Sequence, residues 1–96
     1  MTLPEFKDDI QNNVLPSTLI LQALFYDARG DWGKAHDLVN DLNDPDSSWI
    51  HAYLHRKEGD LWNARYWYRR SGREEFTGSL NDEWEELAQY FLREFA

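Results

Sequence analysis

The chain has no cysteine at any of its 96 positions, which excludes disulfides, thiolate nucleophiles and cysteine-ligated metal sites. Its longest apolar run, residues 19–26, is too short to span a bilayer, and residues 1–9 lack the basic and apolar regions of a signal peptide. A chain of this length has no material for a second core. We therefore expect one soluble, cytoplasmic domain over residues 1–96.

Basic residues are also scarce, since ten Lys and Arg face 18 Asp and Glu, for a net charge of -8. The bases are concentrated in residues 56–73, where six of them stand against two acids, and both flanking segments are acidic. A strongly acidic chain is repelled by polyanions and by anionic lipid. We therefore expect neither a nucleic-acid partner nor a membrane partner.

Strand signals are absent, because no alternation of apolar and polar residues is sustained and no Asn-Gly or Asp-Gly hairpin turn occurs. Helix start signals are frequent, beginning with Thr2 and Glu5 at the spacing of a capping box. Since 42% of the residues are apolar and 16% aromatic, the chain has enough side-chain area for a core. We predict an all-α domain of five or six short helices. The expected helices span about residues 3–13, 19–29, 32–42, 48–58 and 61–71, and about residue 80 to the end, with Asp46 or Ser47 capping the fourth.

An internal repeat is visible when the chain is aligned on its two Gly-Asp pairs, at residues 30–31 and 59–60, which lie 29 positions apart. In this register apolar residues fall on apolar residues, and small residues fall on small ones. The small residues are Ala23 with Ala52, and Ala35 with Ala64. Small side chains at these places allow the two antiparallel helices of a hairpin to approach closely.

This arrangement resembles the tetratricopeptide repeat, a helix-turn-helix unit with a Gly-Asp-aromatic turn. The matching residues are Ala23, Gly30, Asp31, Trp32 and Ala35 in the first unit, and Ala52, Gly59, Asp60, Ala64 and Tyr68 in the second. The resemblance covers about residues 17–72, with a period shorter than the roughly 34 residues of the family. It implies a right-handed array of two hairpins, capped at both ends by the first and last helices. Residues 49–70 also resemble a family of small uncharacterised proteins from bacteria and fungi, and this second resemblance implies no activity.

The repeat resemblance also implies a binding surface, because the first helix of each hairpin lines a concave groove in that family. The matching residues of the second hairpin are Trp49, Tyr53, Arg56 and Lys57. Two aromatic side chains beside two cations suit an acidic or C-terminal peptide segment. We therefore predict a non-catalytic protein-interaction module with a protein or peptide partner, no catalytic residue and no cofactor. The open alternative is that Trp49 and Tyr53 pack against the first or last helix.

The alternative function is a metal-binding protein or a small enzyme, because His51, His55 and Glu58 are spaced i, i+4, i+7 and so share one helical face. The H-E-x-x-H motif of zinc hydrolases is absent, since Ala52 follows His51. The competing interpretation is a buried polar network of histidines. A further metal ligand would have to come from one of His36, Asp31 and Asp60.

Aromatic and basic residues interleave at residues 66–73, in a pattern that nucleic-acid sites also use. Successive residues of a helix point about 100° apart, so Tyr66, Trp67 and Tyr68 cannot form one stacking platform. In the repeat register Trp67 and Tyr68 match apolar residues of the first hairpin. We expect both to belong to the core.

Overall fold

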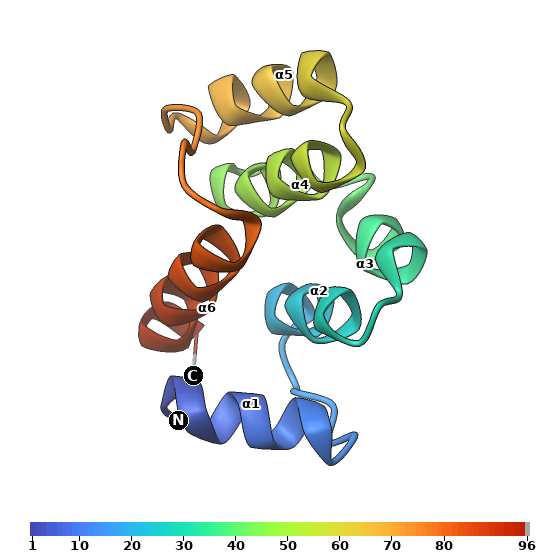
Figure 1. The fold of residues 1–96 in the computed structure, drawn as a ribbon, viewed down its shortest axis with the longest axis vertical. Helices are drawn as coiled ribbons and strands as arrows, with labels where there is room; N and C mark the ends of the chain where they lie inside the picture. The colour runs from blue at the N-terminus through green and yellow to red at the C-terminus, as the bar shows by residue number, and fades with distance from the viewer. Residues whose placement is uncertain (96) are drawn as a thin grey trace.

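The computed structural model describes residues 1–95, with side chains through residue 94, as six α-helices joined by short loops (Figure 1). The helices are α1 (Leu3–Gln11), α2 (Leu19–Ala28), α3 (Trp32–Val39), α4 (Pro45–Glu58), α5 (Leu61–Ser71) and α6 (Leu80–Phe95). The described residues contain no strand, so the prediction of an all-α fold is confirmed. No helix in this part of the chain combines the length and apolarity needed to cross a membrane.

Local side-chain hydrogen bonds set where the helices begin. The backbone N–H of Glu5 donates to Thr2 Oγ1 at 3.3 Å, and the N–H of Thr2 donates to Glu5 Oε1 at 2.8 Å, which completes the predicted capping box. The predicted start of α4 is wrong, because the helix begins three residues earlier, at Pro45. Asp44 is its cap and accepts the N–H of Ser47 at 3.0 Å, while proline fits the first turn, where its missing N–H costs nothing.

The two Gly-Asp turns join α2 to α3 and α4 to α5. Gly30 and Gly59 adopt φ angles of +84° and +88°, in the left-handed region that glycine enters without a Cβ clash. The four aligned alanines are all buried where the paired helices meet: Ala23, Ala35, Ala52 and Ala64. The two hairpins are also joined to each other, because Trp32 Nε1 donates to the carbonyl oxygen of Leu54 at 2.8 Å.

Replacing Gly59 by alanine is expected to lower the free energy of unfolding by about 1–2 kcal/mol, because an L residue is strained at this φ. A Cβ at this position would meet nothing within 4 Å, so the cost is conformational and not steric. The matched control is Gly33→Ala in α3, where φ is not positive and the nearest atom lies at 4.0 Å. We expect this control to stabilise the protein by about 0.5–1 kcal/mol. Chemical denaturation measures both changes, and equal effects of the two substitutions would contradict the turn assignment.

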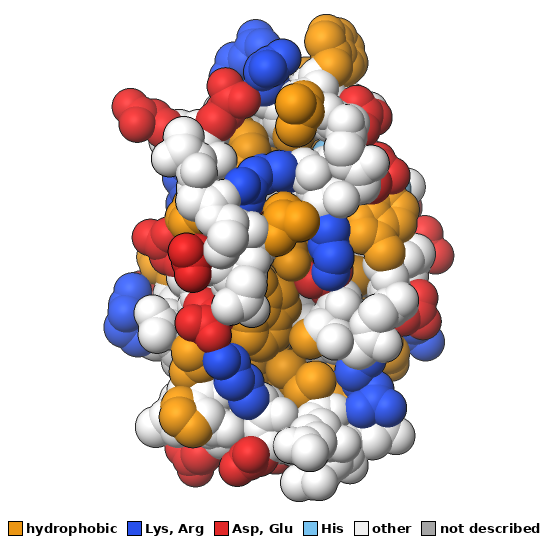
Figure 2. Space-filling model, in the orientation of Figure 1, with side chains coloured by type: hydrophobic (Ala, Val, Ile, Leu, Met, Phe, Trp, Pro, Cys, Tyr) orange, Lys and Arg blue, Asp and Glu red, His pale blue; other side chains and the backbone are white. Residues whose placement is uncertain are grey.

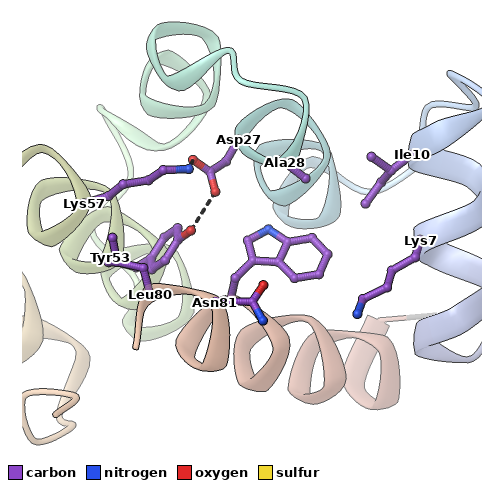
Figure 3. A pocket seen from close by; sticks show the side chains of 9 residues that line it. Lys7, Ile10, Asp27, Ala28, Tyr53, Lys57, Leu80 and Asn81 are labelled. Atoms are coloured by element: carbon purple, nitrogen blue, oxygen red, sulfur yellow. Dashed lines mark hydrogen bonds and ion pairs between the residues drawn. The ribbon is translucent and has the colours of Figure 1, made fainter. Parts of the chain in front are cut away.

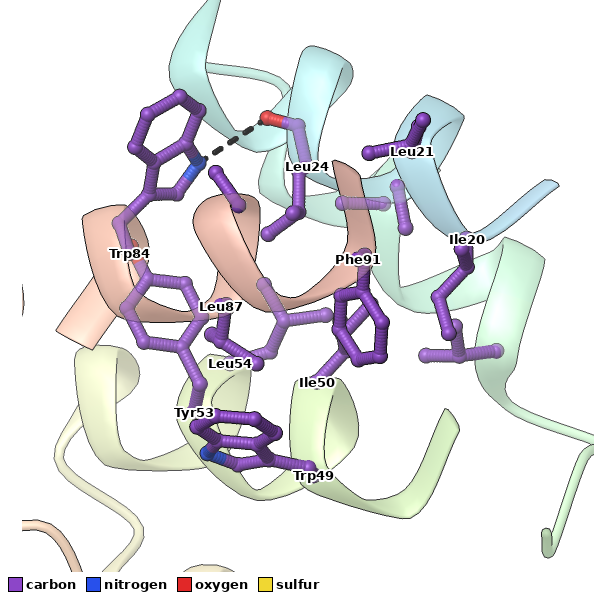
Figure 4. Close-up of a cluster of buried hydrophobic side chains, with 14 of the residues drawn as sticks. Ile20, Leu21, Leu24, Trp49, Ile50, Tyr53, Leu54, Trp84, Leu87 and Phe91 are labelled. Atoms are coloured by element: carbon purple, nitrogen blue, oxygen red, sulfur yellow. Dashed lines mark hydrogen bonds between the residues drawn. The ribbon is translucent and has the colours of Figure 1, made fainter. Parts of the chain in front are cut away.

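The C-terminal helix α6 turns back onto the first half of the molecule. It packs against α1, α2 and α4 (Figure 1). The Trp84 ring stacks on the Phe6 ring of α1 at 5.9 Å, and Trp84 Nε1 donates to the carbonyl oxygen of Leu24 at 3.2 Å. Figure 4 shows the core that results, in which α2, α4 and α6 contribute Ile20, Leu21, Leu24, Trp49, Ile50, Tyr53, Leu54, Leu87 and Phe91. The inner face of α4 is thus covered by α6.

Candidate functional site

The two aromatic residues of the predicted peptide-binding surface lie in the core. Trp49 and Tyr53 are only 7% and 2% exposed. Trp49 Nε1 donates to Glu83 Oε2 of α6 at 3.2 Å, and the Trp49 ring contacts the rings of Tyr90 and Phe91. This is the packing alternative that the sequence left open. In this arrangement the face offers no open aromatic surface, and a peptide-binding role for its residues stays a prediction.

The two cations of the same surface are paired with carboxylates inside the chain. Arg56 Nη1 lies 2.9 Å from Glu83 Oε1, and Lys57 Nζ lies 2.9 Å from Asp27 Oδ1. Both acidic side chains are almost fully buried. An acidic partner would have to compete with these internal carboxylates for each cation.

The buried carboxylates of Asp27 and Glu83 each also accept a hydrogen bond from a tyrosine hydroxyl. Tyr53 donates to Asp27 Oδ2 at 2.8 Å, and Tyr68 donates to Glu83 Oε2 at 2.5 Å. Burial raises the pKa of both tyrosines well above the usual range, and the adjacent carboxylates raise it further. Both hydroxyls therefore remain protonated donors at neutral pH.

A hollow of about 370 Å³ opens beside the Asp27–Tyr53–Lys57 group, between α1, α2, α4 and α6 (Figure 3). Ile10 and Trp84 provide apolar lining, and Lys7 stands at its edge. Lys7 Nζ is itself paired with Glu85 Oε2 at 2.5 Å. Both lysines of the hollow are therefore neutralised within the chain.

All three histidines of the chain meet between the two hairpins. His36 comes from α3, and His51 and His55 come from α4. One ring nitrogen of each lies within 4.8 Å of the other two, and the Nε2 atoms of His36 and His51 are 3.0 Å apart. The fold thus supplies, through His36, the further candidate ligand that the spacing in α4 left open.

The place of Glu58 differs from that expected for a direct ligand of this group. Its Oε1 lies 2.7 Å from His55 Nδ1, which leaves Nε2 of that imidazole for a metal ion. A carboxylate bound to the second nitrogen of a ligating histidine fixes the orientation of the ring and raises its basicity. His55, Glu58 and Asp60 also form a second group whose ligand atoms lie within 4.8 Å of one another. The two candidate groups share His55.

Burial favours the neutral form of two of these imidazoles, those of His36 and His51. His51 is 2% exposed and stacks on Trp67 at 3.9 Å, while His36 stacks on Trp32 at 4.8 Å. Burial and the neighbouring imidazoles lower the pKa of His51 to about 3, and burial lowers the pKa of His36. Neutral imidazole is the form that binds transition metals.

The second ring nitrogen of His51, Nδ1, has no hydrogen-bond partner among the described residues. This atom is buried, as is Ser48 Oγ about one turn earlier in α4, which likewise has no partner in the described part of the chain. The hydrogen bond between the Nε2 atoms of His51 and His36 therefore satisfies only one of the two ring nitrogens of His51. His51 Nδ1 lacks a partner whether Nε2 binds His36 or a metal ion, so this atom does not distinguish a structural network from a metal site.

The spacing of one nitrogen pair in this group suits a tetrahedral metal ion. Two nitrogens on a tetrahedral zinc ion lie about 3.3 Å apart, given zinc–nitrogen bonds of about 2.0–2.1 Å. The Nε2 atoms of His36 and His51, at 3.0 Å, need to separate by only a few tenths of an ångström.

No protein-family model matches the chain, and comparison with curated proteins and with solved structures finds no significant match.

Proposed function

We propose that this protein binds one divalent transition-metal ion, with Zn²⁺ as the first candidate, through the imidazoles of His36, His51 and His55. The observation that carries this proposal is the convergence of three imidazoles, from two helices, within 4.8 Å of one another. Nitrogen ligands favour zinc and its neighbours in the first transition row over magnesium or calcium. Glu58 acts as the outer carboxylate that orients His55.

A metal ion at this site would link the two hairpins and stabilise the folded chain. His36 belongs to the first hairpin, and His51 and His55 belong to the second. An ion bound to all three would join the hairpins at the point where Trp32 also bonds to Leu54. A ligand that binds only the folded chain stabilises it, by about 2.7 kcal/mol when its free concentration is 100 times its dissociation constant.

The test uses the full chain without a histidine tag, stripped by a chelator and titrated with ZnCl₂ in a calorimeter. We expect one zinc ion per chain and a raised melting temperature. His36→Gln and His55→Gln should each weaken binding by more than about 100-fold. Asp41→Asn, which removes an exposed charge near the end of α3, is the matched control and should bind as the unaltered chain does. Sub-stoichiometric zinc, or equal affinity in the histidine variants, would refute the proposal.

We also propose that α2–α5 form a short tetratricopeptide-like array of two hairpins, with α1 and α6 as its accompanying helices. The repeated Gly-Asp turns and the buried alanines at matching positions support this arrangement. The packing of α4 on α3 supports it as well. An experimental structure in which α2–α3 fails to superpose on α4–α5 would contradict it.

A further inference from the structure

The outer side of α5 carries the most exposed aromatic side chain among residues 1–94. Of five tryptophans, Trp62 alone is exposed, at 74%, and it lies between Leu61 at 52% and Tyr66 at 43% exposure. Exposed apolar groups gathered on one face of a helix are typical of a contact surface. Figure 2 shows orange and blue side chains at the top of the molecule, where α5 lies in Figure 1, with red side chains beside them.

The cations on this side of α5 differ from Arg56 and Lys57 in having no buried carboxylate as a partner. Arg69 and Arg70 form no ion pair with any described residue, although Arg70 lies over the rings of Tyr66 and Trp67 at 5.8 and 5.7 Å. Arg65 pairs with Glu75 at 3.2 Å, but both side chains are more than half exposed. Such an exposed pair is weak and readily exchanged for another carboxylate.

The repeat register identifies one edge of this side of α5, at Leu61 and Arg65, as a place where a helix would pack. Leu61 and Arg65 match Trp32 and His36 of α3 in the 29-residue alignment. On α3 these two positions receive the next helix, because Trp32 bonds to Leu54 and His36 contacts His51, both on α4. After α5 the chain instead returns to α1, α2 and α4 through α6. The corresponding edge of α5, at Leu61 and Arg65, is therefore left uncovered, and the exposed Trp62 and Tyr66 lie beside it.

We propose that this surface docks an acidic amphipathic helix of another protein. The surface, termed here the α5 outer face, consists of Leu61, Trp62, Arg65, Tyr66, Arg69 and Arg70. The apolar side of the incoming helix packs on Trp62 and Tyr66, and its carboxylates pair with the arginines, which bind them in bidentate geometry. The occupant is acidic because the uncompensated charge of this face is positive in a chain of net charge -8.

Other occupants fit this face less well. A second copy of the chain brings eight further negative charges toward an already acidic molecule, and an extended polyanion or an anionic vesicle is repelled by a chain of net charge -8. The three successive aromatics of α5 also point in different directions, with Tyr68 buried. They provide no single platform on which bases could stack.

The probe for this surface is a fluorescein-labelled, monomeric synthetic helix with leucine at heptad positions a and d and glutamate at most others, added to the chelator-treated full chain. We expect saturable, salt-sensitive binding seen by fluorescence anisotropy, and none with the same peptide carrying lysine for glutamate. Arg69→Glu with Arg70→Glu, and separately Trp62→Ala, should each weaken binding by about tenfold or more. The charge-matched control, Lys34→Glu with Arg93→Glu, places the same charge change on other exposed sites and should weaken it far less.

Several outcomes would overturn the proposal. These are binding of the lysine peptide with equal affinity, binding that survives the variants on the α5 outer face, and sedimentation of the chain as a dimer through this face. Stronger binding of an RNA oligonucleotide or of phosphatidylserine vesicles would also overturn it. Because the assay contains no metal ion, its result is independent of the zinc titration.

Discussion

Replacing Glu83 by alanine is expected to lower the free energy of unfolding by about 3–5 kcal/mol, a large share of the stability of a domain of this size. The Glu83 side chain is fully buried. It accepts hydrogen bonds from Arg56 at 2.9 Å, Tyr68 at 2.5 Å and Trp49 at 3.2 Å. Its removal takes the acceptor from three donor atoms, one of them Nη1 of the charged, largely buried Arg56, whose Nη2 still donates to the carbonyl oxygen of Gly78.

Two further variants identify the cause of this loss. Glu83→Gln keeps an acceptor oxygen and the side-chain volume but removes the charge, so we expect a smaller loss of about 1–3 kcal/mol. Glu86→Ala removes an exposed carboxylate from the same helix and should change stability by about 0.5 kcal/mol or less. Urea denaturation followed by circular dichroism measures all three. A Glu83→Ala protein as stable as the Glu86→Ala control would show that the buried network contributes nothing net.

The features that the sequence predicts well are those decided within a few residues. The capping box of Thr2 and Glu5 and the helix span of residues 61–71 are confirmed because each depends on local backbone and side-chain chemistry. The error at the start of α4 is also local. After the capping residue Asp44, Pro45 occupies the first helical position, so the helix includes it.

The features that the sequence predicts poorly depend on where helices pack against each other. The apolar stripe of α6 shows that this helix buries a face, but it does not identify the helix against which that face packs. Its packing on α4 places Trp49 and Tyr53 in the core. The special role of Glu83 was missed for the same reason, although its position four residues before the buried Leu87, on the same side of α6, was a usable signal.

In the candidate metal centre too, local features can be predicted from the sequence, whereas those that depend on helix packing cannot. His51 and His55 are joined by helical spacing, which can be read directly from the sequence. The third imidazole, His36, comes from another helix, and its approach depends on how α3 packs on α4. Glu58 shares the helical face with the histidines, and only the structure shows that it contacts His55 Nδ1.

The role of Glu58 leads to a second large effect. Glu58→Gln is expected to weaken zinc binding by about 10–100-fold, the usual effect of losing an outer carboxylate that orients a ligating histidine. The metal-free protein should lose little stability, because the Glu58 side chain is 37% exposed and its pair with His55 is partly screened by solvent. Competition with a chromogenic chelator measures the affinity, and thermal melting without metal measures the stability.

The same variant distinguishes the two candidate ligand groups that share His55. If His36, His51 and His55 hold the ion, His36→Gln weakens binding more than Glu58→Gln does, and Asp60→Asn leaves it nearly unchanged. Asparagine at position 60 can still cap α5, where Asp60 accepts the N–H of Asn63 at 3.3 Å, so this control keeps the turn intact. If His55, Glu58 and Asp60 hold the ion instead, Glu58→Gln and Asp60→Asn each abolish binding and His36→Gln has no effect. That second pattern would replace the three-histidine site with a carboxylate-rich one at the turn between α4 and α5.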